Sequence, residues 1–252
     1  MDVTADKPQV GSAIRIAELI RLAIRQETGL TASAGVSYNK FLAKIASDQN
    51  KPDGIFVVRP HEGAEFVASL PVRRFHGVGP KTSERMGRLG IHEGADLCTK
   101  SMDFMIAHFG KSADYLYHAS RGVDQRLVRS DRTRKSVGHE RTFSEDLSTD
   151  VALSAALEDA IDSVWHSIET SRVAGRTVTL KVKYADFRQI TRSQSFEQCL
   201  TNKSQFGAAA RALLAQLLPA PLGVRLIGLT LSNLSAVESP QARNLINHRA
   251  NL

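Results

Sequence analysis

Residues 75–91 read FHGVGPKTSERMGRLGI, and this stretch indicates a tight turn that leads into a basic helix. Gly77 and Gly79 can both adopt positive φ and carry no side chain, so another molecule can approach the backbone N–H groups between them. Pro80 fixes the backbone of a first helical turn, and Gly90 marks the end of the helix. N–H groups at the start of a helix attract anions, usually phosphate. The stretch therefore predicts a helical domain with a phosphate-binding turn.

Apolar residues on both sides of this stretch keep helical spacing from residue 67 to residue 128. The spacing is interrupted at Gly110 and Gly122, which predicts several short helices and a small all-α domain. Residues 129–135, RSDRTRK, are polar and basic and have little apolar content, so we expect a linker there.

The N-terminal segment, residues 1–66, predicts a βαβ-like arrangement. Residues 12–27 place apolar side chains on one stripe, as in an amphipathic helix, and residues 39–47 form a second helical pattern between two short apolar runs. The segment is too short for a complete α/β domain. We therefore expect part of one.

Beyond the linker, residues 136–235 alternate strand and helix patterns. We expect strands at 137–143, 176–185, 189–198 and 223–234 and helices at 151–171 and 204–218. Helices between strands in this order fit a four-stranded α/β domain of about one hundred residues. The overall expectation is an α+β, multi-domain fold.

The strand TVTLKVKY, residues 177–184, distinguishes the two faces of this sheet. Its apolar side chains alternate with Thr177, Thr179, Lys181 and Lys183, so one face packs on helices and the other presents hydroxyl and ammonium groups. Thr, Ser, Lys and Arg suit a phosphate backbone, and QITRSQS adds Thr191, Arg192 and Ser193. An ordinary solvated sheet face has a similar composition, so this alternative stays open.

Composition limits the function classes. The net charge of +7 is unevenly distributed, with six basic and one acidic residue in residues 172–192. This asymmetry suggests one face that meets a polyanion, and a soluble surface with a modest positive excess fits the charge equally well. The sequence has no apolar run long enough to span a membrane and no signal-peptide pattern, so we expect a cytoplasmic protein without membrane contact. The sequence has two cysteines and eight histidines, and the histidines lack the spacing of metal ligands. We therefore expect neither a disulfide framework nor a metal site.

Five stretches occur in the order and spacing of one family. They are SAGVSYNKFLAKIASDQNKPDG (33–54), the GVGPKT turn with LGI behind it, FGKSADYLYHASRGVD (109–124), RKSVGHERTF (134–143) and KYADFRQITRSQSF (183–196). In these stretches the chain resembles the Y-family DNA polymerases, which copy past DNA lesions, and in particular the bacterial DNA polymerase IV branch. The resemblance covers essentially all of residues 1–235.

The resemblance implies a role for each segment. Residues 1–66 match the C-terminal part of the palm, 67–128 the helix-hairpin-helix thumb, 136–235 the little-finger domain, and 236–252 a flexible tail. Lys51 matches the lysine that contacts the triphosphate of the incoming nucleotide.

The implied partner is primer-template DNA, held without sequence preference. The DNA-binding positions implied in the thumb are Gly77, Val78, Gly79, Lys81 and Thr82. Those implied in the little finger are Lys181, Lys183, Thr191, Arg192 and Ser193.

The family's catalytic carboxylates have no match in this chain. Phosphoryl transfer needs divalent ions, Mg²⁺ in this family, held by an Asp on the first palm strand and an Asp-Glu pair, and these would lie upstream of MDVT at residues 1–4. The resemblance therefore implies a truncated polymerase that holds no Mg²⁺ by itself and does not extend primers alone. Asp2 and Asp6 are poor replacements for the missing metal-binding carboxylates, because they lie at an end of the chain that can fray.

Two alternatives stand beside a truncated polymerase. The first is a non-catalytic DNA-binding or clamp-associated module. Gln241, Leu245 and Ile246 of the tail loosely resemble a peptide that docks on the sliding clamp, and an ordinary disordered tail is the alternative for these residues. The second is a chain that folds poorly, because half a palm would expose the apolar stripe of residues 12–27.

Overall fold

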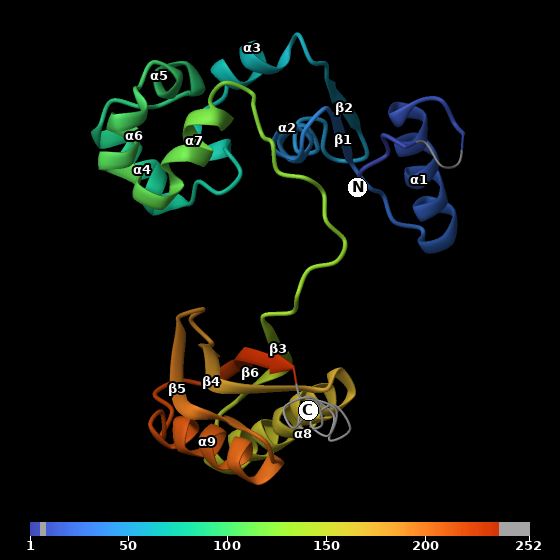
Figure 1. Cartoon of the computed structure of the whole chain (residues 1–252). Helices are drawn as coiled ribbons and strands as arrows, with labels where there is room; N and C mark the ends of the chain where they lie inside the picture. Colours follow the sequence, from blue (N-terminus) through green and yellow to red (C-terminus); the bar gives the residue numbers. More distant parts are fainter. Residues whose placement is uncertain (6–8, 237–252) are drawn as a thin grey trace, which may run out of the picture. The chain divides into compact units, whose positions relative to one another are not determined.

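The computed structural model describes residues 1–5 and 9–236 (Figure 1). The chain forms two compact units, and the boundary between them along the sequence falls between Ser130 and Asp131, inside the segment expected as a linker. Helices occur in both units, and the C-terminal unit contains a four-stranded antiparallel sheet. The expected α+β fold is confirmed. Asp6 and the tail residues after Ala236 lie outside the described residues.

The N-terminal unit begins with the expected βαβ-like segment. It contains helix α1 (Ala13–Thr28), strand β1 (Ala34–Ser37), helix α2 (Lys40–Ala46) and strand β2 (Ile55–Val58). The two strands pair in parallel, as a crossover through a helix requires. Asn39 caps α2 because its side chain accepts a hydrogen bond from the backbone N–H of Leu42.

Helix α1 is held mainly by Arg21. The Arg21 guanidinium donates to the Ala32 carbonyl and to the Asp53 carboxylate, both at 2.7 Å. Only Ile16 of this helix is buried, whereas Leu19 and Ile20 of the same apolar stripe are 39% and 37% exposed. The apolar stripe of α1 is therefore exposed within this chain, as expected.

Seven short helical segments complete the N-terminal unit. They are α3 (Gly63–Ala68), η1 (Val72–Arg74), α4 (Pro80–Arg88), α5 (Gly94–Cys98), α6 (Met102–Phe109), η2 (Gly110–Ser112) and α7 (Ala113–Ala119). Their buried side chains, among them Met86 and Leu116, form one hydrophobic cluster with Phe41 and Leu42 of α2. The two segments expected on either side of residue 66 thus share a single core.

Hydrogen bonds around Gly122 reinforce this shared core. Tyr38 Oη and Asn39 Nδ2 both donate to the Gly122 carbonyl, at 2.9 and 2.8 Å. Gly63 lies in the same region, and a Cβ atom at this position would clash with the Tyr38 hydroxyl. Glycine at position 63 therefore allows the Tyr38 hydroxyl to lie close to the start of α3.

The C-terminal unit is one sheet with two helices. Its elements are β3 (Ser136–Leu147), α8 (Asp150–Ser171), β4 (Val173–Tyr184), β5 (Gln189–Leu200), α9 (Lys203–Ala215) and β6 (Val224–Ala236). The strands lie in the order β3-β6-β4-β5, and every neighbouring pair is antiparallel. Both helices cover the same face of the sheet, as Figure 1 shows. The opposite face, not covered by α8 or α9, is called the open face below.

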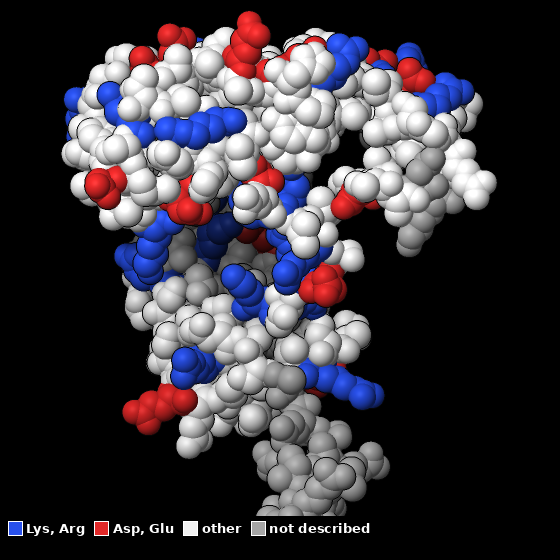
Figure 2. All heavy atoms as spheres, turned by 45° about the horizontal axis from the view of Figure 1, so that its top comes forward, with Lys and Arg blue, Asp and Glu red and all other residues white. Residues whose placement is uncertain are grey.

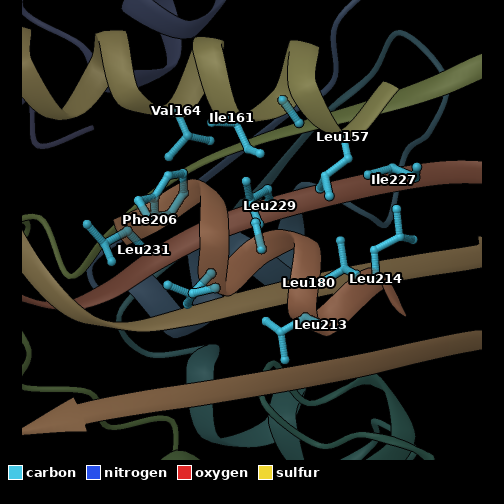
Figure 3. Close-up of a cluster of buried hydrophobic side chains, with 14 of the residues drawn as sticks. Leu157, Ile161, Val164, Leu180, Phe206, Leu213, Leu214, Ile227, Leu229 and Leu231 are labelled. Carbon is cyan, nitrogen blue, oxygen red and sulfur yellow. The ribbon is translucent and has the colours of Figure 1, made fainter. Parts of the chain in front are cut away.

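The core of this unit lies between the helices and the sheet. Leu180 of β4 and Leu229 of β6 are paired neighbours at its centre and are fully buried. Leu157, Ile161 and Val164 of α8, with Phe206 and Leu213 of α9, point toward them (Figure 3). The expected alternation in β4 is confirmed, since Val178, Leu180, Val182 and Tyr184 are all at most 1% exposed.

Among the described residues, none of the helices has both the length and the apolar character that crossing a membrane requires.

Candidate nucleic-acid interface

The glycine turn, residues 75–79, is a closed backbone turn. The Val78 N–H donates to the Phe75 carbonyl at 3.0 Å, and Gly77 occupies the third position with φ of +92°. Type II turns need a positive φ at this position, which explains the glycine. Val78 anchors the turn in two ways, because its N–H is used within the turn and its side chain is buried. The Val78 N–H is therefore committed to the turn.

Gly79 does not use the positive φ that glycine allows. It is the N-cap of α4 in an extended conformation, with φ of −84°. A Cβ atom added there would meet no other heavy atom within 4 Å. Neither backbone geometry nor packing inside the chain requires glycine at position 79. The missing side chain instead leaves open space over the start of α4.

Backbone donors face this open space. The first intrahelical bond of α4 runs from the Ser83 N–H to the Gly79 carbonyl, and Gly79 has no side chain that could cap the N–H groups of Lys81 and Thr82. In residues 1–5 and 9–236, no hydrogen-bond partner is recorded for these N–H groups or for those of Gly77 and Gly79. The exposed ammonium group of Lys81 lies on the same turn of helix. This arrangement favours binding of a phosphate.

The open face of the C-terminal sheet carries rows of polar side chains. Strand register aligns Glu140, Gly228, Lys181 and Thr191 in one row across the four strands, and Gly138, Thr230, Thr179 and Ser193 in the next. Residues directly opposite each other on neighbouring strands point to the same face. The sheet thus brings together Thr179, Lys181, Thr191 and Ser193, as the sequence predicts.

Several of these groups already have partners in the unbound chain. Lys181 Nζ lies 2.6 Å from Glu140 Oε2, and the hydroxyl groups of Thr179 and Ser193 are hydrogen-bonded at 2.9 Å. Glu140 was not a predicted site residue, because its position beside Lys181 depends on the register of β3 against β6. The carboxylate lowers the positive charge that this face offers to a phosphate.

Arg192 does not belong to the same row. It pairs with Leu180, whose side chain is buried under the helices, so Arg192 starts on the helix side of the sheet. Thr191 and Ser193, on either side of it, point to the open face. The three consecutive residues thus divide between two faces, although Arg192 is exposed because β5 is an edge strand.

Phe187 at the turn between β4 and β5 is a site that the sequence analysis missed. Its side chain is 60% exposed, and its φ is +66°, which is unusual for an aromatic residue. Lys183 Nζ lies 4.8 Å and Arg225 Cζ 5.1 Å from the ring centroid, within the range of cation–π attraction. The ring thus contacts two cationic side chains from different strands. The sequence shows an aromatic residue in a polar turn, but not that Arg225 of β6 meets it.

Lys51 lies at an exposed turn between α2 and β2. Its ammonium group forms an ion pair with Asp48, which also binds Lys44, and hydrogen bonds from both lysines lower the pKa of Asp48. Asp53 shapes the turn, with φ of +53° and hydrogen bonds from Arg21. Asp48 and Asp53 thus both make contacts within or beside this turn. No other predicted site residue of the described chain is recorded in contact with Lys51.

Candidate metal ligands are scattered. In the part of the chain that the structure describes, no three His, Cys, Asp or Glu side chains are grouped so that they could hold a metal ion. Asp2 is engaged locally, because the backbone N–H and the hydroxyl of Thr4 donate to its carboxylate and lower its pKa. These residues do not fit a Mg²⁺ site.

Charge alone does not mark the interface. Figure 2 shows Lys and Arg side chains with Asp and Glu side chains between them on the surface in view. The ion pairs Arg211–Glu158 between α9 and α8 and Arg88–Glu84 on α4 are examples of this mixing. The two candidate surfaces, one in each unit, are distinguished by backbone donors and by polar rows rather than by a uniform basic surface.

Three family descriptions match the sequence. The impB/mucB/samB family matches residues 1–48, the IMS family HHH motif matches residues 60–91, and the impB/mucB/samB family C-terminal domain matches residues 134–245. The HHH match includes the glycine turn and α4. The C-terminal match includes the whole four-stranded sheet.

Individual relatives and structures agree with these matches. The chain is 51% identical to "DNA polymerase IV 2" of Agrobacterium fabrum, over 93% of this chain and 66% of the relative, and 48% identical to "DNA polymerase IV" of Gluconobacter oxydans, over 95% and 67%. A solved structure of a Y-family DNA polymerase chimera matches with a TM-score of 0.68 at 25% identity, covering 88% of this chain and 64% of that one. The chain spans about two thirds of the length of these proteins.

Proposed function

Because this chain belongs to the impB/mucB/samB family of Y-family DNA polymerases, we propose that it forms the DNA-binding part of a lesion-bypass DNA polymerase. In this proposal, residues 67–128 act as a thumb and residues 136–235 as a little finger on primer-template DNA. Residues 1–66 contribute the C-terminal part of the palm. Lys51 binds the triphosphate of the incoming nucleotide once its ion pair with Asp48 opens.

The glycine turn is the observation that carries the proposal. Among the described residues, the N–H groups of Gly79, Lys81 and Thr82 have no hydrogen-bond partner and lie beside open space. Backbone N–H groups can bind a phosphate but carry no means of reading a base. The Thr179, Lys181, Thr191 and Ser193 side chains of the open face are a second group of phosphate contacts. Both groups support binding without sequence preference.

Mg²⁺ is assigned to no residue of this chain. Y-family polymerases generally depend on divalent metal ions, which activate the primer hydroxyl and neutralise the leaving pyrophosphate. The described residues do not supply a ligand set for these ions. We therefore expect the 252-residue chain to bind primer-template DNA without extending the primer.

Salt titration and primer extension test this proposal together. We expect the affinity for a labelled primer-template duplex, measured by fluorescence anisotropy, to fall steeply between about 50 and 200 mM salt and to be similar for unrelated sequences. An affinity unaffected by salt, or no binding at low salt, would contradict the proposal. Extension with Mg²⁺ and four nucleotides would show that a catalytic site exists in this chain, whereas binding alone also fits a non-catalytic DNA-binding module.

A change on the open face tests the second group of contacts. Glu140→Gln should tighten DNA binding roughly two- to fivefold, because it frees Lys181 from its 2.6 Å ion pair and removes a negative charge from the phosphate-binding face. The matched control is Glu158→Gln, which removes the same charge on the helix layer, where Glu158 binds Arg211. If both variants tighten binding equally, only net charge matters and the open face is not the contact surface.

The proposal includes a clamp contact and a cellular location. Residues 236–252, with Gln241, Leu245 and Ile246, are assigned to docking on a sliding clamp, although residues 237–252 lie outside the described part of the chain. We place the protein in the cytoplasm, with its DNA.

A further inference from the structure

Tyr115 of α7 is the side chain that holds the glycine turn. Its hydroxyl donates to the His76 carbonyl at 2.6 Å, and its ring lies 3.5 Å from the position that a Cβ atom of Gly77 would occupy. Burial raises the pKa of the Tyr115 hydroxyl, so the group stays protonated and able to donate. The bond links residues far apart in the sequence, and sequence analysis gave Tyr115 no role.

The position of this hydrogen bond determines the direction of a neighbouring N–H group. The His76 carbonyl and the Gly77 N–H belong to the same peptide plane, and a trans peptide points them in opposite directions. Type I and type II turns differ mainly in how this central peptide is oriented. By binding the carbonyl, Tyr115 fixes the type II orientation and directs the Gly77 N–H away from its own ring.

Tyr115 is itself held from the side of α2. The Arg126 guanidinium stacks on its ring, 4.4 Å from the centroid, and forms an ion pair at 2.7 Å with Asp124. The Asp124 side chain is only 2% exposed and accepts a hydrogen bond from the Phe41 N–H at 3.1 Å. The ring of Phe41 meets Tyr115 edge-on, with centroids 6.2 Å apart. These contacts connect the start of α2 to the glycine turn.

We propose that Tyr115, braced by Arg126 and Asp124, is a positioning residue that holds the N–H groups of the glycine turn in the orientation that binds a DNA phosphate. Tyr115 does not touch the DNA in this arrangement and acts through the His76–Gly77 peptide. The proposal rests on the function proposed above. It adds that the shape of the turn is imposed by a side chain outside it, so that the turn need not become ordered when DNA binds.

The variant Tyr115→Phe tests this inference, because it removes the hydroxyl and keeps the ring that packs on Phe41 and Arg126. We expect the affinity for a primer-template duplex to fall roughly three- to tenfold, since a poorly oriented turn loses about one hydrogen bond to phosphate. The slope of log affinity against log salt should decrease by up to about 0.9, as expected for one lost phosphate contact. Binding is measured well below the thermal midpoint of each variant.

Tyr117→Phe is the matched control. Tyr117 lies on the same helix, but its ring stacks on Arg121, 3.6 Å from Cζ, and no contact with the glycine turn is recorded among the described residues. The affinity of the Tyr117→Phe variant for the duplex, and the slope of its log affinity against log salt, should be unchanged. Equal losses in the two variants would show that helix α7 is merely stabilised by tyrosine hydroxyls, and would overturn the inference.

A double-mutant cycle separates positioning from a remote effect. In a chain that already carries Gly77→Val and Gly79→Val, Tyr115→Phe should weaken binding no further, because both changes act on the same turn. The same fold-change in both backgrounds would overturn the positioning role. If the unchanged chain binds no DNA, the proposed function fails. If it binds and Tyr115→Phe has no effect, only the role of Tyr115 fails.

Discussion

The double variant Gly77→Val, Gly79→Val is expected to bind primer-template DNA roughly ten- to hundredfold more weakly than the unchanged chain at low salt. Hydrogen bonds from backbone N–H groups to a charged phosphate contribute about 1.5–3 kcal/mol each, and the added side chains would cover these donors. The measurement is fluorescence anisotropy on a labelled duplex. A loss of less than twofold would mean that the turn serves only to start α4.

The two glycines contribute for different reasons, and the single variants separate them. At Gly77, φ of +92° makes valine strained by about 1–3 kcal/mol, so the turn itself would be distorted. At Gly79, φ is −84° and the space is open, so valine fits the turn. Gly79→Val should therefore weaken DNA binding with little loss of thermal stability. This outcome would indicate that the open space beside Gly79 is occupied by a bound molecule.

Gly87→Ala is the matched control for these changes. Gly87 lies on the same helix, and its added Cβ would come no closer than 3.9 Å to a neighbouring atom of His92. Alanine in place of an interior helix glycine stabilises by about 0.5–1 kcal/mol, and DNA affinity should be unchanged. Weaker DNA binding in this variant would show that any added side chain on α4 perturbs the interface.

Leu229→Ala is expected to destabilise the C-terminal unit by about 3–5 kcal/mol, the largest stability effect predicted for a single residue here. Leu229 is fully buried in β6, pairs with Leu180 of β4, and belongs to the cluster that α8 and α9 cover. The sheet and helices cannot fully collapse around the cavity that alanine leaves. The open face would then lose its DNA contacts together with the fold of the unit.

Trp165 provides the measurement. It is the only tryptophan in the chain and packs against Phe206, with ring centroids 6.1 Å apart, so its fluorescence during urea unfolding reports on the C-terminal unit. Val151→Ala is the control, because Val151 is 80% exposed on α8 and its truncation should change stability by less than about 0.5 kcal/mol. Similar unfolding midpoints for the two variants would contradict the assigned core.

Local sequence patterns predicted the elements of both units well. The alternation in TVTLKVKY identified the buried face of β4, and Pro80 and Gly90 marked the start and the end of α4 correctly. These features depend on a residue's own backbone preferences and on side-chain periodicity, which are local in the chain. The expected fold class followed from them, whereas the family followed from the resemblance of five stretches of sequence.

Two details of the predicted site depend on structure that the sequence does not specify. Glycine allows positive φ at position 79, but the backbone there is extended. Arg192 was grouped with Thr191 and Ser193 because the residues are adjacent, but neighbours in a strand point to opposite faces. Composition suggested the right surface, and strand geometry decided which side chains lie on it.

The sequence by itself determined the helices and strands, the buried face of the sheet and the existence of a glycine turn, because these depend on interactions between residues close in the chain. Only the tertiary structure decided that Tyr115 holds the His76 carbonyl, that Glu140 pairs with Lys181, and that Lys183 and Arg225 meet at Phe187. Each of these contacts joins separate elements. Their geometry is set by how helices pack and by the register of strands, which no local pattern specifies.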